Sequence, residues 1–342
     1  MALKPIRNGR LTGAHGGDLD AARILFPNAP EPWIDLSTGV NPHSYPDLAV
    51  PYKAQKQLPP PVKLELLRNS AAAAYRLSDP SAVVVSAGTQ PVLAAIMRMI
   101  EPGGAAILGP TYSEHARSAA LAGHQVEETG KIENLADADI AVVVNPNNPD
   151  GRLTERNGLL ELAGALRQRS GILLVDEAFM DVAPDGYSVA DDFTTTNIVV
   201  LKSFGKFFGL AGIRLSFAIA PADIAAYLAA VMGPWPVSAT ALETGIAALN
   251  DAKWRTVMRE RLQDDGDRLA SLLRSVELKI AGGTNLFQLV NHDNAPQLFE
   301  HLGNSGIFVR HFPDRPHYLR LGLPASEEAW SRLSNALLGW KG

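Results

Sequence analysis

The sequence of 342 residues contains no cysteine. Disulfide scaffolds, cysteine-ligated zinc, iron–sulfur clusters and thiol catalysis are therefore excluded, and a cytoplasmic location is the simplest expectation. Apolar runs are also short, about six residues at most against roughly 18 for a membrane span, so we expect no membrane segment. The basic N-terminus precedes no apolar stretch, and a signal peptide is not expected.

The sequence also has only a small excess of acidic over basic residues. Lys and Arg total 31 and Asp and Glu total 36, which gives a formal net charge of −5. An acidic total argues against a nucleic-acid or anionic-membrane partner. The eight histidines show no metal-ligand spacing, so no metal is expected.

Three common catalytic and nucleotide-binding motifs are absent as well. The Walker phosphate loop, the dinucleotide Gly-x-Gly-x-x-Gly and the hydrolase elbow Gly-x-Ser-x-Gly do not occur. Nucleotide kinases, classical dehydrogenases and serine hydrolases are therefore disfavoured.

What the sequence does contain is a regular alternation of short β-branched runs with helical stretches. This pattern predicts an α/β fold with a mostly parallel sheet covered by helices on both faces. Thr154 is expected to be the N-cap of a helix that runs to about residue 169. The expected strands of this sheet are 82–85, 105–108, 140–144, 172–175, 198–201 and 215–219.

The length favours two domains. We predict an N-terminal arm and substrate loop over residues 1–45, a large domain over 46–236 and a smaller C-terminal α/β domain over 237–342. Up to about residue 61 the chain is rich in Pro and Gly, which predicts loops rather than a packed unit. A helix over 254–273 is long enough to bridge the domains.

Polar residues follow three of the predicted strands, in the segments 145–149, 174–179 and 202–214. Ligands of open parallel sheets bind at the carboxyl ends of strands, so we expect the three segments to form one site. Asp176 ends a buried strand and needs a cationic or hydrogen-bonding partner, for which a protonated pyridine nitrogen is suitable. Lys206 has apolar neighbours, which lower the pKa of an amine and favour its reaction with an aldehyde.

A phosphate site is indicated beside these two residues. Ser203 and Arg214 supply a hydroxyl and a planar cation. Gly88, Thr89 and Gln90 stand at a strand-to-helix turn, where main-chain amides can receive a phosphate. Together the residues predict pyridoxal 5′-phosphate, with its aldehyde on Lys206 and its ring nitrogen on Asp176.

The order of these motifs resembles that of the fold type I pyridoxal-phosphate enzymes, in the histidinol-phosphate aminotransferase-like branch, over nearly the whole chain. Within the branch, Phe179 replaces the tyrosine usual in aminotransferases, and this is similar to the threonine-phosphate decarboxylases of cobalamin biosynthesis. The motif that contains His15, Gly16 and Gly17 resembles theirs too. The segments that carry the resemblance are 14–18, 34–42, 86–90, 110–112, 145–149, 176–179 and 203–214.

The resemblance also implies roles for individual residues. Tyr112 would stack on the cofactor ring, and Asn148 would bond its 3′-oxygen. Arg320 would bind the substrate carboxylate, with Arg310 nearby. The two arginines and the loop of His15, Gly16 and Gly17 would hold a phosphorylated amino acid, whose phosphate favours such partners.

The resemblance implies a homodimer with sites at the subunit interface. A family tyrosine that reaches a phosphate is replaced here by Leu58 and Pro59, so Tyr45 or Tyr52 would have to substitute. Purely structural roles stay open as alternatives for several of the candidate residues. They are a surface lysine for Lys206, a helix cap or ion pair for Asp176, turn formation for Asn148, core packing for Tyr112, strand-edge salt bridges for Arg310 and Arg320, and a solvated turn for His15.

The expected reaction is decarboxylation of L-threonine O-3-phosphate to (R)-1-amino-2-propanol O-2-phosphate. A histidinol-phosphate-type aminotransferase is the main alternative, and a non-catalytic pyridoxal-phosphate-binding protein is a lesser one.

Overall fold

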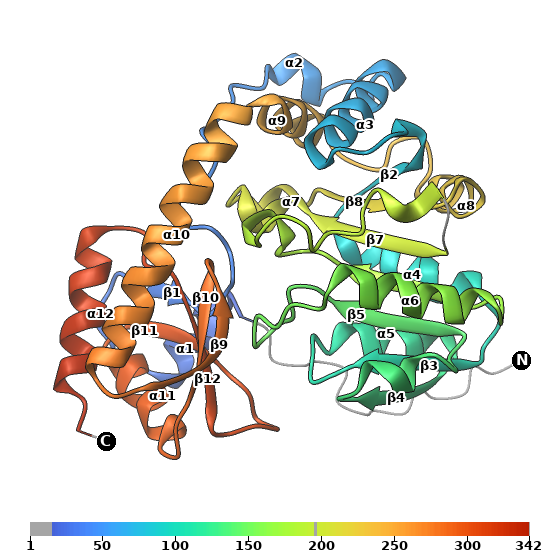
Figure 1. The fold of residues 1–342 in the computed structure, drawn as a ribbon. Coiled ribbons are helices and arrows are strands. Elements are labelled where there is room, and N and C mark those ends of the chain that lie inside the picture. The colour runs from blue at the N-terminus through green and yellow to red at the C-terminus, as the bar shows by residue number, and fades with distance from the viewer. Residues whose placement is uncertain (1–15, 195–196, 342) are drawn as a thin grey trace, which may run out of the picture.

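Short runs of aliphatic and β-branched residues form two β-sheets in the computed structural model, which describes residues 16–194 and 197–341 (Figure 1). The larger sheet has seven strands and the smaller has five. In their spatial order, the strands of the larger sheet are β2 (Val83–Ser86), β8 (Ser216–Ile219), β7 (Ile198–Ser203), β6 (Ile172–Asp176), β5 (Ile140–Val144), β3 (Gly104–Leu108) and β4 (Gln125–Thr129).

The seven-stranded sheet is mostly parallel, as predicted. Only β8 runs antiparallel to its neighbours β2 and β7. Side chains alternate between its two faces, so that on β5 Ile140 and Val142 belong to one hydrophobic cluster and Ala141 and Val143 to another. Both faces are buried under helices, which explains why these strands are continuous apolar runs.

Helices α4 (Thr89–Met99), α5 (Glu114–Ala122) and α8 (Ala222–Met232) cover one face of this sheet. Helices α3 (Pro61–Tyr75), α6 (Arg156–Arg167) and α9 (Ala239–Asn250) cover the other. The predicted cap of α6 is wrong: its N-cap is Glu155 and no side chain bonds its first turn within the described residues. Thr154 instead donates its amide to Asn145 Oδ1, because the chain is still extended there.

The smaller sheet contains a strand from the N-terminal part of the chain. Residues up to 61 were expected to form an arm and loops, but Ile34–Leu36 pairs in parallel with Ile307–Val309. This pairing buries Leu36 fully and Ile34 partly. In spatial order its strands are β1 (Ile34–Leu36), β11 (Ile307–His311), β12 (Tyr318–Gly322), β10 (Phe287–Asn291) and β9 (Lys279–Thr284).

Helix α10 (Ala252–Ser275) connects the two sheets. Its 24 residues span about 36 Å, and Figure 1 shows it running from beside α9 to the flank of the smaller sheet. The division at residues 45 and 236 remains a proposal. The remaining helices are α1 (Leu19–Leu25), α2 (Tyr52–Gln55), α7 (Phe204–Phe207), α11 (Ala295–Asn304), α12 (Glu327–Gly339) and the 3₁₀ turns Pro80–Ala82, Ile132–Leu135, Met180–Val182, Asp192–Thr194 and Ala211–Ile213.

Across residues 16–194 and 197–341, the helices are too short or too polar to cross a membrane.

Candidate active site

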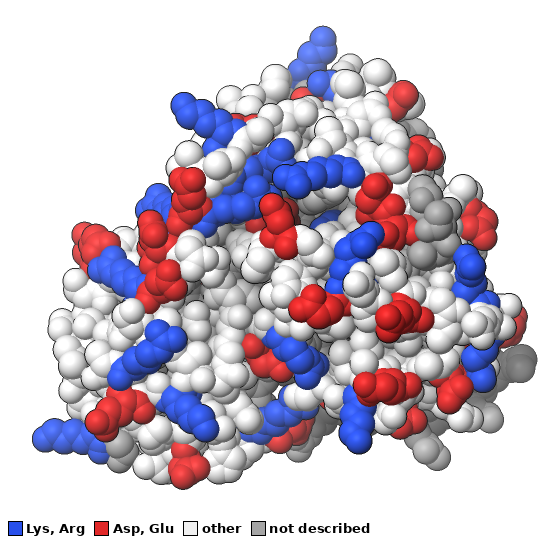
Figure 2. Space-filling model, in the orientation of Figure 1, with Lys and Arg blue, Asp and Glu red and all other residues white. Residues whose placement is uncertain are grey.

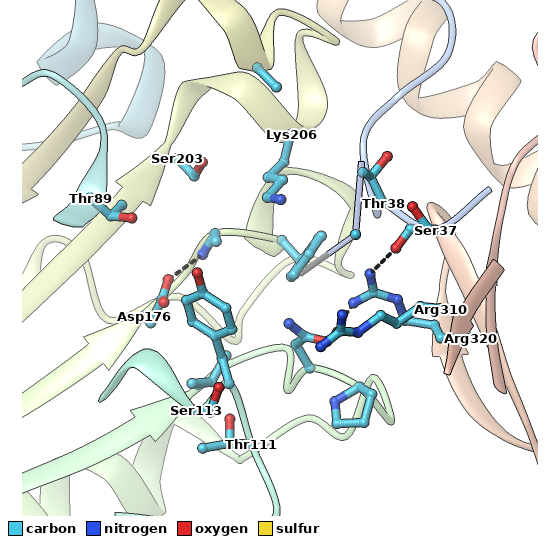
Figure 3. A pocket seen from close by; sticks show the side chains of 18 of the residues that line it. Ser37, Thr38, Thr89, Thr111, Ser113, Asp176, Ser203, Lys206, Arg310 and Arg320 are labelled. Carbon is cyan, nitrogen blue, oxygen red and sulfur yellow. Dashed lines mark hydrogen bonds between the residues drawn. The ribbon is translucent and has the colours of Figure 1, made fainter. Parts of the chain in front are cut away.

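The carboxyl ends of the parallel strands open onto a pocket of about 630 Å³, and the β11–β12 hairpin forms its opposite wall. Figure 3 shows Lys206 pointing into the pocket, between Asp176 on one side and the pair Arg310 and Arg320 on the other. The pocket is lined by twelve of the residues singled out from the sequence: Gly16, Gly88, Thr89, Gln90, Tyr112, Asn148, Asp176, Ser203, Lys206, Arg214, Arg310 and Arg320.

Two of the predicted residues are not among them. Gly17 lies outside the lining, and its amide donates to Ser37 Oγ over 2.7 Å. His15 falls outside the described residues.

Lys206 lies on α7, the single turn of helix that follows β7. Burial is the largest reason why the pKa of Lys206 falls from 10.5 to about 8. The nearby guanidinium groups of Arg320 and Arg214 lower it further, and the carboxylate of Asp176 opposes them. Near neutral pH, a lysine with this pKa loses its proton more easily than an ordinary lysine does. The resulting neutral amine is the form that attacks an aldehyde.

Asp176 ends β6 and is held in place by two donors. Its Oδ1 accepts the amide of Ala178 over 3.0 Å, and its Oδ2 lies 2.9 Å from His115 Nε2. A carboxylate fixed in this way still has lone pairs to offer a pyridinium nitrogen. His115 is not among the predicted site residues, because its position three residues after Tyr112 does not by itself indicate a bond to a distant strand.

The turn before α4 forms a cradle for an anion. No described side chain caps its first turn, so the amides there face the pocket. Gly88 has φ +86°, and a Cβ at this position would overlap the guanidinium group of Arg214. With Ser203 across the pocket, these donors fit the phosphate of the predicted cofactor, and Lys206 and Asp176 fit its aldehyde and ring nitrogen.

Tyr112 lies beside this cradle. Burial is the main cause that raises the pKa of Tyr112, and a hydrogen bond with Gln90 opposes it. The ring therefore stays a neutral, apolar surface, as stacking on a cofactor requires.

Arg320 is buried, and its position is fixed by two acceptors. Nη1 donates to Asn148 Oδ1 over 2.5 Å and Nη2 donates to the main-chain oxygen of Ser37 over 2.9 Å. Burial, and then the charge of Arg310, lower the pKa of Arg320 to about 10, so it remains a cation near neutrality. Because Asn148 turns its oxygen to Arg320, its NH₂ group is the one that would donate to the 3′-oxygen of a cofactor.

The outer rim of the pocket was not predicted. Arg315 on the β11–β12 hairpin lies 3.4 Å from Glu128 on β4 and pairs with it across the rim. Ser37 and Thr38 belong to the 34–42 motif and Thr111 to the 110–112 motif, both of which were recognised in the sequence, whereas the positions of the others depend on tertiary contacts. The unpredicted polar residues of the lining are Ser37, Thr38, Thr111, Ser113, Glu128, Asp314 and Arg315.

Phe179 presents an apolar ring where a tyrosine would present a hydroxyl. The ring is 4% exposed, and Lys206 Nζ lies 5.6 Å from its centroid. It packs edge-on against Phe287 at 5.2 Å, and Phe287 in turn lies under the guanidinium group of Arg320.

Of the two tyrosines expected to replace the family tyrosine, one is already engaged. Tyr45 packs against Phe208 and Trp254 and hydrogen bonds Asp251. Tyr52 on α2 is 70% exposed, so its side chain is accessible to another molecule.

The described residues contain no cluster of three or more His, Cys, Asp or Glu side chains that could hold a metal ion. On the face shown in Figure 2, basic and acidic side chains are interspersed. The positive charge in the pocket therefore comes from individual arginine and lysine side chains and not from an excess of basic residues in the whole molecule.

Comparison with known proteins shows the family of the chain. Residues 31–336 match the family described as "Aminotransferase class I and II". A threonine-phosphate decarboxylase of Pseudomonas aeruginosa is 41% identical over 330 residues, which cover 96% of this chain and 98% of that protein. One from Sinorhizobium sp is 38% identical, over 94% of this chain and 97% of that protein.

A solved structure is similar over nearly the whole chain. The histidinol-phosphate aminotransferase of Sinorhizobium meliloti, solved in complex with pyridoxal-5′-phosphate, has a TM-score of 0.83 and 18% identity, and covers 98% of this chain and 97% of that one.

Proposed function

Because the chain belongs to the class I and II aminotransferase family and, within it, to the threonine-phosphate decarboxylases, we propose that it removes the α-carboxylate of L-threonine O-3-phosphate. The predictions of the fold, the family and the pyridoxal 5′-phosphate cofactor are confirmed. The observation that carries the proposal is one pocket that holds Lys206, Asp176, the buried Arg320 and the half-buried Arg310 beside the apolar Phe179.

The residues would hold the cofactor by its three polar ends. Lys206 Nζ would bond its aldehyde, Asp176 would keep its ring nitrogen protonated, and the amides of the α4 turn with Ser203 and Arg214 would bind its phosphate. When bound, the cofactor accepts the electron pair of a bond broken at the substrate Cα.

The bond between Cα and the carboxylate breaks, CO₂ leaves, and Cα takes up one proton. Lys206 Nζ is placed to deliver that proton, and its lowered pKa favours the transfer near neutral pH. The product is the phosphate ester of 1-amino-2-propanol, with one carbon fewer than the substrate.

Arg310 and Arg320 decide which bond breaks. With the cofactor bound, the orientation of the substrate would determine which bond at Cα breaks, so the substrate must be held by groups remote from Cα. A phosphate monoester carries about −1.5 to −2 charges and a carboxylate one more, and these two arginines with Gly16 nearby are suited to both. Phe179 lacks the hydroxyl of the aminotransferases at this position.

Release of CO₂ from L-threonine O-3-phosphate tests the proposal. We expect one CO₂ per substrate consumed, with no requirement for a keto acid. Stoichiometric conversion of 2-oxoglutarate to glutamate with an amino donor would instead support the aminotransferase alternative. A protein that carries the cofactor but turns over neither substrate would support the non-catalytic alternative.

We also propose that the enzyme is a homodimer and that it is cytoplasmic. The exposed Tyr52 supports the first part, because a side chain 70% exposed on α2 can reach the site of a second subunit. It would then act as the replacement for the family tyrosine lost at Leu58.

A further inference from the structure

The main-chain carbonyls that follow the catalytic lysine are held by a segment far away in the sequence. Helix α7 has only one turn, and its carbonyls accept long local bonds from the amides of Phe208 and Gly209 as well as bonds from outside the helix. The carbonyl of Lys206 accepts the amide of Asn41 over 2.9 Å, and the carbonyl of Phe208 accepts the amide of Tyr45 over 2.8 Å. The carbonyl between them, of Phe207, accepts the side-chain Nδ2 of Asn41 over 2.7 Å.

Asn41 is buried and is in close contact both with its own segment and with the turn that carries Lys206. It is 2% exposed, and its Oδ1 accepts the amide of His43 over 2.8 Å, which folds its own segment into a turn. On the lysine side of the contact, Gly209 lies directly against the main chain of Asn41. It has φ +67°, and a Cβ there would come within 2.6 Å of the carbonyl oxygen of Asn41. The lysine turn and the Asn41 turn therefore fit together without space between them.

The same segment, residues 37–45, also reaches the other side of the pocket. The carbonyl of Ser37 accepts Nη2 of Arg320, and Ser37 and Thr38 line the pocket. At its far end His43 Nε2 lies 2.7 Å from Asp265 Oδ2 on α10, which anchors the segment to the helix that joins the two sheets. One short piece of chain thus touches the arginine on β12 and the lysine on α7.

We propose that Asn41 is a positioning residue, which fixes the turn that carries Lys206, while Ser37 at the other end of the same segment separately holds Arg320. This rests on the proposed function only in that Lys206 is the reacting lysine. Its amine must meet the cofactor aldehyde and later the substrate Cα, and a misplacement of about 1 Å at such a centre lowers the rate about 100-fold.

The test compares Asn41→Ser, Asn41→Ala and Asn197→Ala in the holoenzyme. A serine hydroxyl can still accept the amide two residues on, which preserves the turn at His43, but it is too short to reach the carbonyl of Phe207. Asn197 is the matched control, because its side-chain amide also donates to a main-chain carbonyl, that of Gly171, at the opposite end of β7.

Three quantities are measured for each variant: kcat and KM for L-threonine O-3-phosphate, the pH midpoint of the visible absorption of the lysine-bound cofactor, and the thermal midpoint. For Asn41→Ser and Asn41→Ala we expect kcat to fall about ten- to 100-fold with KM within about twofold. The absorption midpoint should shift by about half a pH unit or more, which is about threefold in the protonation equilibrium. Asn197→Ala should lower only the thermal midpoint.

Two results would overturn the proposal. If Asn41→Ser behaves as the wild type, the bond to Phe207 has no role and the turn at His43 is all that matters. If both Asn41 variants change only the thermal midpoint, as Asn197→Ala does, the role is merely structural. Because the absorption midpoint needs no substrate, it remains readable even if the protein releases no CO₂.

Discussion

Lys206 combines burial with two neighbouring cations, and this has a consequence for stability. In the cofactor-free protein its pKa is about 8, against 10.5 for an ordinary lysine. Below about pH 8 it is charged in both the folded and the unfolded state, and the folded state bears the full penalty of burial. Between about pH 8 and 10.5 the folded state binds fewer protons, so the wild type gains stability as the pH rises.

We therefore expect Lys206→Met to be more stable than the wild type at about pH 7, and this advantage to shrink as the pH rises through 8 to 10.5. Urea unfolding of both proteins at a series of pH values measures the difference. A difference that stays constant with pH would contradict the lowered pKa.

A second prediction at the residue scale concerns the geometry of the Arg320 guanidinium group. Arg320→Lys keeps the charge but loses the fork that bonds Asn148 and the carbonyl of Ser37. A lysine also cannot make the paired hydrogen bonds of a guanidinium group to the substrate carboxylate. Hydrogen bonds of this charged kind are worth about 1.5–3 kcal/mol, so we expect a KM for substrate about ten- to 100-fold higher.

The control for this substitution is Arg332→Lys. Arg332 also donates to main-chain carbonyls, those of Pro30, Pro32 and Ser305, but far from the pocket. It should lose stability and leave KM unchanged. Steady-state kinetics of the two variants decides, and an equal KM for Arg320→Lys and the wild type would rule out the proposed grip.

At this scale the sequence predicted residues whose chemistry is visible in their immediate neighbours. Lys206, Asp176 and Arg214 stand in apolar or glycine-rich surroundings at strand ends, and all three line the pocket. His115 and Glu128 could not be found in this way. Their importance comes from bonds to Asp176 and Arg315, which lie 61 and 187 positions away.

The N-terminus of α4 is the element that we propose binds the cofactor phosphate, and Gly88 allows the close approach of Arg214 to it. Gly88→Ala would place a Cβ at φ +86° against that guanidinium group. We expect cofactor affinity to fall about tenfold or more, since a cost of 1.4 kcal/mol is enough for this and such strain is of order 1–3 kcal/mol.

Gly158→Ala in α6 is the matched control. A Cβ there would have no neighbour within 4 Å, and alanine is the better helix former, so stability should rise by about 0.5–1 kcal/mol with cofactor affinity unchanged. Dialysis against a series of cofactor concentrations, followed by absorption, measures both variants. Equal affinity for all three proteins would show that the turn does not bind the phosphate.

Elements were predictable where both faces of a strand are buried. β5, β6 and β7 are continuous apolar runs, and their expected positions agree with the observed ones to within two residues. β4 is an edge strand of sequence QVEET whose first four residues are exposed, so it carries no hydrophobic pattern. β1 has three residues and takes its partner from the far end of the chain, which no local signal encodes.

At the scale of the whole molecule, the proposed dimer needs an apolar surface that the monomer leaves open. Val62 and Leu66 lie one turn apart on α3 and are 58% and 45% exposed, and Leu58 just before the helix is 64% exposed. They follow α2, which carries the exposed Tyr52, so a second copy seated on this surface would bring that tyrosine to the interface.

Introducing charge on this surface should therefore separate the subunits. For the double substitution Val62→Lys and Leu66→Lys we expect a monomer at micromolar concentration, because two buried cations without partners oppose association. Leu121→Lys on α5, where the native side chain is also 58% exposed, should remain a dimer. Sedimentation equilibrium gives the masses. A wild type that sediments as a single chain would contradict the dimer, and dissociation by Leu121→Lys as well would move the interface away from α3. If the interface is as proposed, the double variant should also lose decarboxylation while its cofactor absorption persists, since each pocket would then lack the Tyr52 of its partner.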